Sequence, residues 1–127
     1  MKLRIKGNSL RLRVTRSELE RLLKNARIEE TIYFSPDGQS RLTYVLEHSQ
    51  DAVDVTSRFS SSEIAIVLPT KDTERWGCGD QVGIYATIYL GPQGSLNLVV
   101  EKDFACLDLS DADNFDTFPN SNANAVC

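Results

Sequence analysis

The sequence lacks any long hydrophobic run. No stretch approaches the roughly 20 apolar residues that a membrane-spanning helix needs, and the basic start continues into alternating residues instead of an apolar signal segment. We therefore expect no membrane association and a cytoplasmic location. The 127 residues, 41% hydrophobic and 25% charged, are typical of one ordinary globular domain.

Cysteine and histidine are scarce. Cys78, Cys106 and Cys127 are an odd number of widely spaced cysteines without a C-x-x-C pair, which favours neither a disulfide framework nor a zinc ribbon. We expect them to be reduced thiols. His48 would complete a set of four zinc ligands, but the spacing matches no zinc finger, and an exposed loop histidine is the favoured interpretation.

Motifs of the common enzyme classes are also absent, including the phosphate loop, the dinucleotide fingerprint, the zinc-protease helix and the nucleophile elbow. Cys78 lies near the end of a predicted helix, whereas a nucleophilic cysteine is favoured at a helix start or beside a cation. The acidic residues near the C-terminus do not follow the calcium-loop spacing; they are Asp103, Asp108, Asp111, Asp113 and Asp116. We expect no catalytic residue, metal or cofactor.

Basic residues, in contrast, concentrate at the start of the chain. Residues 1–27 contain nine lysines and arginines against two glutamates, a net charge of +7. Since the whole chain carries −4, the remaining hundred residues carry −11.

Residues 2–6 and 10–14 alternate apolar and charged residues, with opposite parity on either side of Gly7-Asn8. This pattern predicts a β-hairpin with a tight turn, in which Ile5 faces Leu10 and Arg4 faces Arg11. A helix follows, because Thr15 and Glu18 form a capping box and the leucines after them have helical spacing through residue 25.

Further strands are predicted at 29–34 and 41–47, separated by a Pro- and Gly-containing turn at 35–38. The second half repeats this order, with strands around residue 59 and at 64–68, a short helix at 71–76, and strands at 81–90 and 96–102. Pro69 suits the start of that helix and the glycines at 77 and 79 suit its end.

The two halves resemble each other at a shift of 54 residues. The pattern T-I-Y-x-x-P-x-G occurs at 31–38 and 87–94, and L-T-Y-V-L-E at 42–47 corresponds to L-N-L-V-V-E at 96–101 after a two-residue gap. Chance similarity of two amphipathic segments is the alternative. We favour an internal duplication, in which residues 1–110 form one strand-rich α+β domain with halves at about 1–54 and 55–110.

In this α+β fold the halves are related by a pseudo-two-fold axis, with a swapped-hairpin-like barrel as one form. Residues 111–127 form an acidic, Asn- and Ser-rich tail. The predicted core consists of Leu3, Ile5, Leu10, Leu12, Val14, Leu19, Leu22, Ile32, Phe34, Leu42, Tyr44, Leu46, Ile64, Ile66, Leu68, Trp76, Val82, Ile84, Ile88, Leu96, Leu98 and Val100.

The predicted hairpin gathers cations on its outer surface. The candidate polyanion-binding residues are Lys2, Arg4, Lys6, Arg11, Arg13 and Arg16. Like charges opposite each other destabilise a hairpin, so the cluster needs an explanation. One is neutralisation by Glu29, by Glu30 or by the acidic residues near the C-terminus, Asp108, Asp111, Asp113 and Asp116. The other is an anionic ligand, meaning nucleic acid, a phosphorylated molecule or an acidic protein.

Three tyrosines form a candidate interface. The strand parity that buries Ile32 and Ile88 places Tyr33, Tyr85 and Tyr89 on the opposite surface, where they would serve a protein partner or self-association. Cover by a helix of the same chain is the alternative.

Five segments carry a resemblance to a known family: M-K-L-R-I-K-G-N-S-L-R-L-R-V, E-E-T-I-Y-F, L-T-Y-V-L-E, V-L-P with the later W and D-Q-V-G-I, and V-E-K-D-F-A-C-L-D. The chain resembles, over nearly its entire length, a small bacterial family known only as a domain of unknown function, which implies no activity. The strand and helix order is also similar to the swapped-hairpin barrels of bacterial transition-state regulators and antitoxins, which implies DNA binding through the first strand and helix. This chain departs from them because only its first half is basic.

The sequence therefore favours a non-enzymatic binding or assembly module. Polyanion binding through the basic hairpin is the alternative, and a hydrolase or transferase is the least favoured class.

Overall fold

The computed structural model describes residues 1–106 and 110–120. Its elements are β1 (Lys2–Lys6), β2 (Ser9–Val14), α1 (Arg16–Asn25), β3 (Arg27–Tyr33), β4 (Arg41–Ser49), β5 (Thr56–Ser60), β6 (Glu63–Pro69), α2 (Thr70–Cys78), β7 (Gly83–Tyr89), the 3-10 turn η1 (Gly91–Gln93), β8 (Ser95–Lys102) and α3 (Asp111–Asn114). The prediction of a strand-rich fold with a few helices is confirmed.

The strands form two four-stranded sheets, and each sheet combines one hairpin from the first half of the chain with one from the second half. The first sheet has the order β1-β2-β8-β7 and the second β3-β4-β6-β5. In each sheet the central pair, β2 with β8 or β4 with β6, is parallel, and the outer pairs are antiparallel. Both sheets are open, because no ladder of the described strands joins them, so the predicted barrel is not confirmed.

The first hairpin has the predicted register. Arg4 pairs with Arg11 and Ile5 with Leu10. Gly7 adopts a φ of 55°, a left-handed conformation that residues with a Cβ rarely adopt in tight turns.

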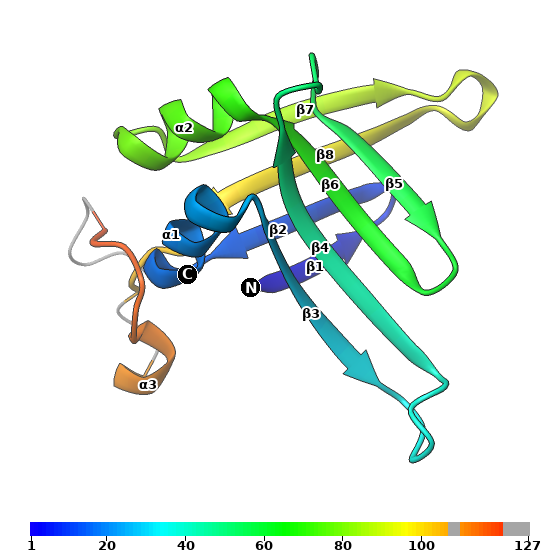
Figure 1. Cartoon of the computed structure of the whole chain (residues 1–127), viewed down its shortest axis with the longest axis horizontal. Helices are drawn as coiled ribbons and strands as arrows, with labels where there is room; N and C mark the ends of the chain where they lie inside the picture. The colour runs from blue at the N-terminus through cyan, green and yellow to red at the C-terminus, as the bar shows by residue number, and fades with distance from the viewer. Residues whose placement is uncertain (107–109, 121–127) are drawn as a thin grey trace.

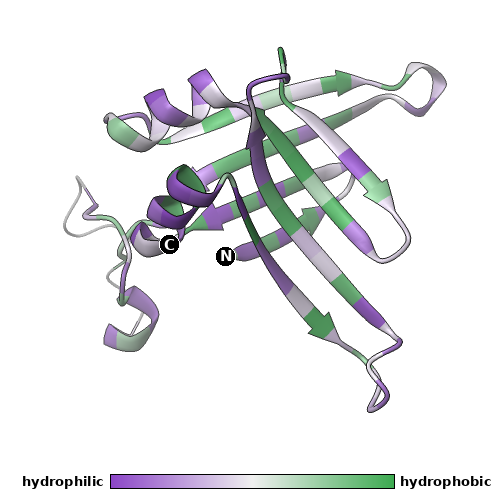
Figure 2. Cartoon of the chain, in the orientation of Figure 1, coloured by the Kyte–Doolittle hydropathy of each residue, from purple (hydrophilic) through white to green (hydrophobic). Residues whose placement is uncertain are grey.

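The core lies where the helices meet the two sheets. Helices α1 and α2 lie at one end of the sheets, and the β3–β4 and β7–β8 hairpins project from the other (Figure 1). Leu22 of α1 and Trp76 of α2 are fully buried and belong to one cluster with β-strand residues such as Leu12, Leu46 and Leu98. The strands carry alternating hydrophobic and hydrophilic bands, as expected when only one surface of each sheet faces this core (Figure 2).

Four predicted core residues are exposed instead: Ile5, Ile32, Phe34 and Val82. Ile5 and Ile32 have the inward parity but lie near the turn ends of their hairpins, where Ile5 pairs with Leu10 and Ile32 with Leu42. Phe34 follows the end of β3 and Val82 precedes β7. The alternation of apolar residues predicted which surface of its sheet a strand residue lies on. It did not predict how much of that surface the rest of the chain covers.

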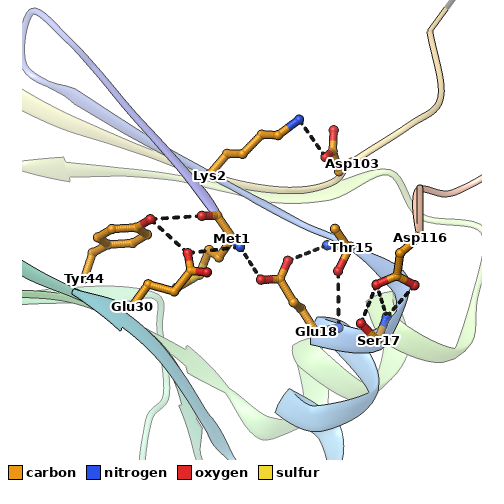
Figure 3. Close-up of polar contacts among 9 residues, drawn as sticks. All are labelled: Met1, Lys2, Thr15, Ser17, Glu18, Glu30, Tyr44, Asp103 and Asp116. Atoms are coloured by element: carbon orange, nitrogen blue, oxygen red, sulfur yellow. Dashed lines mark hydrogen bonds and ion pairs between the residues drawn. The ribbon is translucent and has the colours of Figure 1, made fainter. Parts of the chain in front are cut away.

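The start of α1 anchors the N-terminus of the chain (Figure 3). Thr15 and Glu18 form the predicted capping box. The Glu18 carboxylate also forms an ion pair with the α-ammonium group of Met1, which lies 3.1 Å from Glu30 as well. Burial and the carboxylate of Glu30, whose Oε2 accepts a 2.9 Å hydrogen bond from Tyr44, raise the pKa of Tyr44 to about 12.

His48 is not the exposed loop residue that we expected. It lies half-buried on β4, with Nδ1 2.9 Å from Thr70 Oγ1 and Nε2 3.1 Å from the carbonyl oxygen of Leu22. Because a carbonyl only accepts, Nε2 carries a proton, and Nδ1 forms the second hydrogen bond with the threonine hydroxyl. The ring thus connects β4 to both helices.

The cysteines differ from the expectation of three reduced thiols. Cys78 is free and exposed, as expected. Cys106, however, is disulfide-bonded. Cys127 lies outside the described residues, which end at 120.

The described part of the tail packs against the domain. Phe104 and Phe118 form an isolated bridge, and Phe118 also contacts the core. The backbone of Arg16 donates a hydrogen bond to the Asp116 carbonyl, and the Asp116 carboxylate accepts from Ser17. These hydrogen bonds hold the segment at the start of α1.

No helix among residues 1–106 and 110–120 has the length and apolar character required to cross a membrane.

We predict that Glu18→Gln lowers the free energy of unfolding at pH 7 by about 1–2 kcal/mol, because it weakens the capping box and removes the ion pair. Hydrogen bonds from the N-terminus and Thr15 outweigh burial and hold the pKa of Glu18 below its ordinary value of 4.5. A carboxylate with a lowered folded pKa stabilises the fold above its unfolded pKa, and this contribution is lost as the pH falls through the folded value.

Urea unfolding at pH 7 and at steps below pH 4.5 tests this. The difference between wild type and Glu18→Gln should shrink as the pH falls. Glu20→Gln, at an exposed position of the same helix, is the control and should change the free energy of unfolding little. An equal effect of both variants would contradict the assigned role of Glu18.

Candidate functional site

The outward-pointing residues of the first sheet form a continuous surface, which we call the basic face. Because side chains alternate along each strand, the register aligns three rows across β1, β2, β8 and β7. The rows are Lys2-Arg13-Glu101-Gly83, Arg4-Arg11-Val99-Tyr85 and Lys6-Ser9-Asn97-Thr87. The basic face therefore carries five basic residues and one carboxylate.

The second sheet has an outer surface with the same arrangement, which we call the neutral face. Its rows are Thr56-Val67-Glu47-Arg27, Arg58-Ala65-Val45-Glu29 and Ser60-Glu63-Thr43-Thr31. These three rows carry two arginines and three glutamates, and the pair Tyr33-Arg41 continues the surface with a third, exposed arginine. The two sheets thus share strand order and register but differ in the charge they present to solvent.

Ion pairs satisfy the charges of the neutral face. Arg58 lies 2.6 Å from Glu47, and Arg27 lies 3.0 Å from Glu63. Since Arg27 is on β3 and Glu63 on β6, this second pair crosses the strand between them, β4. Val45, the outward residue of β4 at that point, is accordingly fully buried.

On the basic face, neutralisation is confined to two positions. Arg11 Nε lies 2.6 Å from Glu101 Oε1, and Lys2 Nζ lies 3.0 Å from Asp103 Oδ2. Among the described residues, no carboxylate forms an ion pair with Arg4, Lys6 or Arg13. Arg4 and Lys6 are also exposed, so their charges are available to a ligand.

The basic face is hollowed at its centre. A depression of about 300 Å³ is lined by Arg4, Lys6, Arg11, Tyr85 and Glu101, among others. A smaller one of about 190 Å³ adjoins it along β1 and β2, lined by Lys2, Leu3, Arg4, Arg11 and Arg13. The cations therefore surround concave surface that a ligand can enter.

The sixth candidate cation lies apart from the other five. Arg16 is exposed at the first position of α1, where Asp116 interacts with the same helix start. Hydrogen bonds from Ser17 lower the pKa of Asp116. Of the acidic residues near the C-terminus, Asp103 and Asp116 thus approach predicted cations, whereas Asp108 lies outside the described residues.

The three candidate interface tyrosines are exposed but divided between the sheets. Tyr85 and Tyr89 lie on β7 and Tyr33 on β3. Their exposed fractions are 61%, 84% and 64%, so no helix of the described chain covers them. Tyr85 is the one that the tertiary structure brings to the candidate cations.

Sequence reasoning missed Val99 and Glu101 as companions of the basic hairpin. Both lie on β8, which pairs with β2 across about ninety residues of sequence. The alternation in residues 96–102 correctly placed them on one surface of a strand, but no local signal identified β2 as the neighbour.

The described residues contain no group of three or more His, Cys, Asp or Glu side chains that could hold a metal ion.

Comparison with protein families gives one result. A family model described as a family of unknown function, DUF7009, matches residues 1–122. No curated protein and no solved structure matches the chain.

The two faces lead to a stability prediction. Arg4→Gln should leave the free energy of unfolding within about 0.5 kcal/mol of wild type, or raise it slightly, because Arg4 lies opposite Arg11 without a carboxylate partner. Arg58→Gln, at the equivalent position of the neutral face, should lower it by about 0.5–1 kcal/mol, since Glu47 loses its 2.6 Å ion pair and keeps the longer one to Arg27, at 3.6 Å.

Urea midpoints of both variants in low salt are the measurement. A larger loss for Arg4→Gln than for Arg58→Gln would show that the cations of the basic face stabilise the fold.

Proposed function

We propose a binding function, and not a catalytic one, for this chain, which belongs to the DUF7009 family of unknown function. The basic face binds polyanions, meaning nucleic acid or another phosphorylated ligand. The observation that carries this proposal is the contrast between two faces of equivalent architecture. Ion pairs join the charged residues in the three rows of the neutral face, whereas on the basic face they reach two of the five cations, Lys2 and Arg11.

The cations are not required by the fold. The register places Arg4 opposite Arg11 and Lys2 opposite Arg13, pairs of like charge that disfavour the hairpin. At the equivalent positions of the second sheet, Arg58 lies opposite Ala65 and Thr56 opposite Val67. The same architecture therefore forms without a basic hairpin, which supports a role in ligand binding for the extra charges.

We further infer that the chain arose by internal duplication and has the exchanged hairpins of a swapped-hairpin fold. The strand pairings of the first sheet recur in the second after a shift of 54 residues. The pair Lys2↔Arg13 corresponds to Thr56↔Val67. The pair Ser9↔Asn97 corresponds to Glu63↔Thr43, with Ser9 shifted forward and Asn97 shifted backward. This repetition supports a common origin of the halves. It also supports the view that only the first sheet acquired its charge.

Assembly through the exposed tyrosines is a second candidate function. Tyr33 and Tyr89 lie at the ends of the two projecting hairpins, where apolar surface remains exposed beside them at Phe34 and Leu90. Light scattering over a range of concentrations tests it: a dimer lost in Tyr33→Ser/Tyr89→Ser supports assembly, and a monomer throughout argues against it.

We predict that the protein binds heparin and inorganic polyphosphate at about 50 mM salt, with an affinity that falls steeply as salt rises. The double variant Arg4→Gln/Lys6→Gln should bind both at least about tenfold more weakly, because it removes unpaired cations from the depression. Isothermal titration at several salt concentrations is the measurement.

The matched control is Arg21→Gln/Lys24→Gln, which removes the same net charge from exposed positions of α1. It should bind nearly as tightly as wild type. Equal weakening of binding by both double variants would show that net charge alone, and not the basic face, determines the affinity, which contradicts the proposal. Absence of binding by wild type would also overturn the proposed function.

A further inference from the structure

The basic face has a central row with a cationic half and an uncharged half. Its central row runs Arg4-Arg11-Val99-Tyr85 across four neighbouring strands. The cations lie on β1 and β2, while β8 and β7 present an aliphatic side chain and an aromatic ring. Neighbouring strands are about 4.8 Å apart, so Tyr85 lies roughly 10 Å from Arg11 at the level of the backbone.

The ring of Tyr85 is exposed at the uncharged end of this row. It is 61% exposed, and it lines the same depression as Arg4, Lys6 and Arg11. A Cβ built on Gly83 would lie 3.2 Å from the Tyr85 hydroxyl oxygen. The Tyr85 side chain therefore extends back along β7 over Gly83, which has no side chain. The neutral face has Glu29 at the equivalent position, so the ring is particular to the basic face.

Glu101 limits where an anion can lie. Its carboxylate is held by Arg11 Nε on the β8 side of the row, and it also acts on Tyr85, whose pKa is raised by burial and by this charge. Phosphates are repelled from this half of the depression and attracted to Arg4 and Lys6. A ligand that fits must combine anionic groups, which lie on β1, with a flat, uncharged group at the Tyr85 end of the row.

We propose that the basic face binds single-stranded nucleic acid, with phosphates on Arg4 and Lys6 and one base stacked on Tyr85. This rests on the proposed polyanion binding and names its ligand class. An unpaired strand offers both a phosphate chain and free base faces, and base stacking on an aromatic side chain tolerates any sequence. In a double helix the base faces are already stacked, and polyphosphate has none.

The test compares Tyr85→Ala with two matched variants. Tyr33→Ala removes an equally exposed tyrosine from the second sheet, where the exposed fraction is 64%. Tyr85→Phe keeps the ring and removes the hydroxyl. The probes are a fluorescent oligothymidylate of about 15 nucleotides, the corresponding duplex and inorganic polyphosphate. Circular dichroism and urea midpoints establish that each variant is folded.

Tyr85→Ala should bind the single strand about ten- to a hundredfold more weakly than wild type and polyphosphate equally well. Tyr33→Ala and Tyr85→Phe should bind the single strand like wild type, and wild type should prefer the single strand to the duplex. Equal binding of the single strand by Tyr85→Ala and wild type, or a preference of wild type for the duplex, would overturn this inference. If wild type still binds polyphosphate in that case, the proposed function stands. Absence of binding to every probe would overturn both.

Discussion

The parallel pairing of β2 with β8 and of β4 with β6 is the constraint on which the rest of this structure depends. Each pair joins a hairpin of one half to a hairpin of the other. A two-stranded hairpin is at best marginally stable in water, whereas four strands with one apolar surface against helices bury a core. The halves are therefore stabilised together, and α1 and α2 each contribute one fully buried large residue, Leu22 and Trp76, to a shared cluster.

The same pairing creates the candidate site. The basic residues are encoded within fifteen residues of the N-terminus, but the depression that they surround also needs Val99, Glu101 and Tyr85. On an isolated hairpin the cations would be mutually repelling charges in water, where screening is strong. Beside β8, Arg11 is held by Glu101 while Arg4 stays exposed next to a concave surface, which is an arrangement suited to binding.

The neutral face, for which no ligand is proposed, shows how its charged residues pair with one another on the same architecture. Its arginines form ion pairs with glutamates of other strands, and Val45 on β4 is fully buried. Such exposed ion pairs contribute little individually to stability, but they join all five charged residues of the three rows: Arg27, Arg58, Glu29, Glu47 and Glu63. On the basic face, no carboxylate of the described residues forms an ion pair with Arg4, Lys6 or Arg13. The proposed polyanion binding would use these charges.

Local patterns in the sequence determined most of the elements. The alternation around Gly7, the capping box of Thr15 and Glu18, and the turn residues near Pro36 and Pro92 predicted strands, a helix and turns within a few residues of their ends. These signals depend on neighbours in the chain, through backbone sterics, side-chain parity and hydrogen bonds over three or four residues. For the same reason the charged surface of the first hairpin was predictable residue by residue.

Only the tertiary structure decided which hairpins share a sheet, where the apolar surfaces lose their cover, and what lies beside the cations. Ile5 and Ile32 have core parity yet are exposed, and His48 was expected at the surface yet connects two helices. These outcomes depend on contacts between segments far apart in sequence, which burial of a common core selects and which no local pattern records. The scarcity of cysteine, histidine and long apolar runs limited what the chain is expected to do, and the pairing of β2 with β8 decided what its basic residues face.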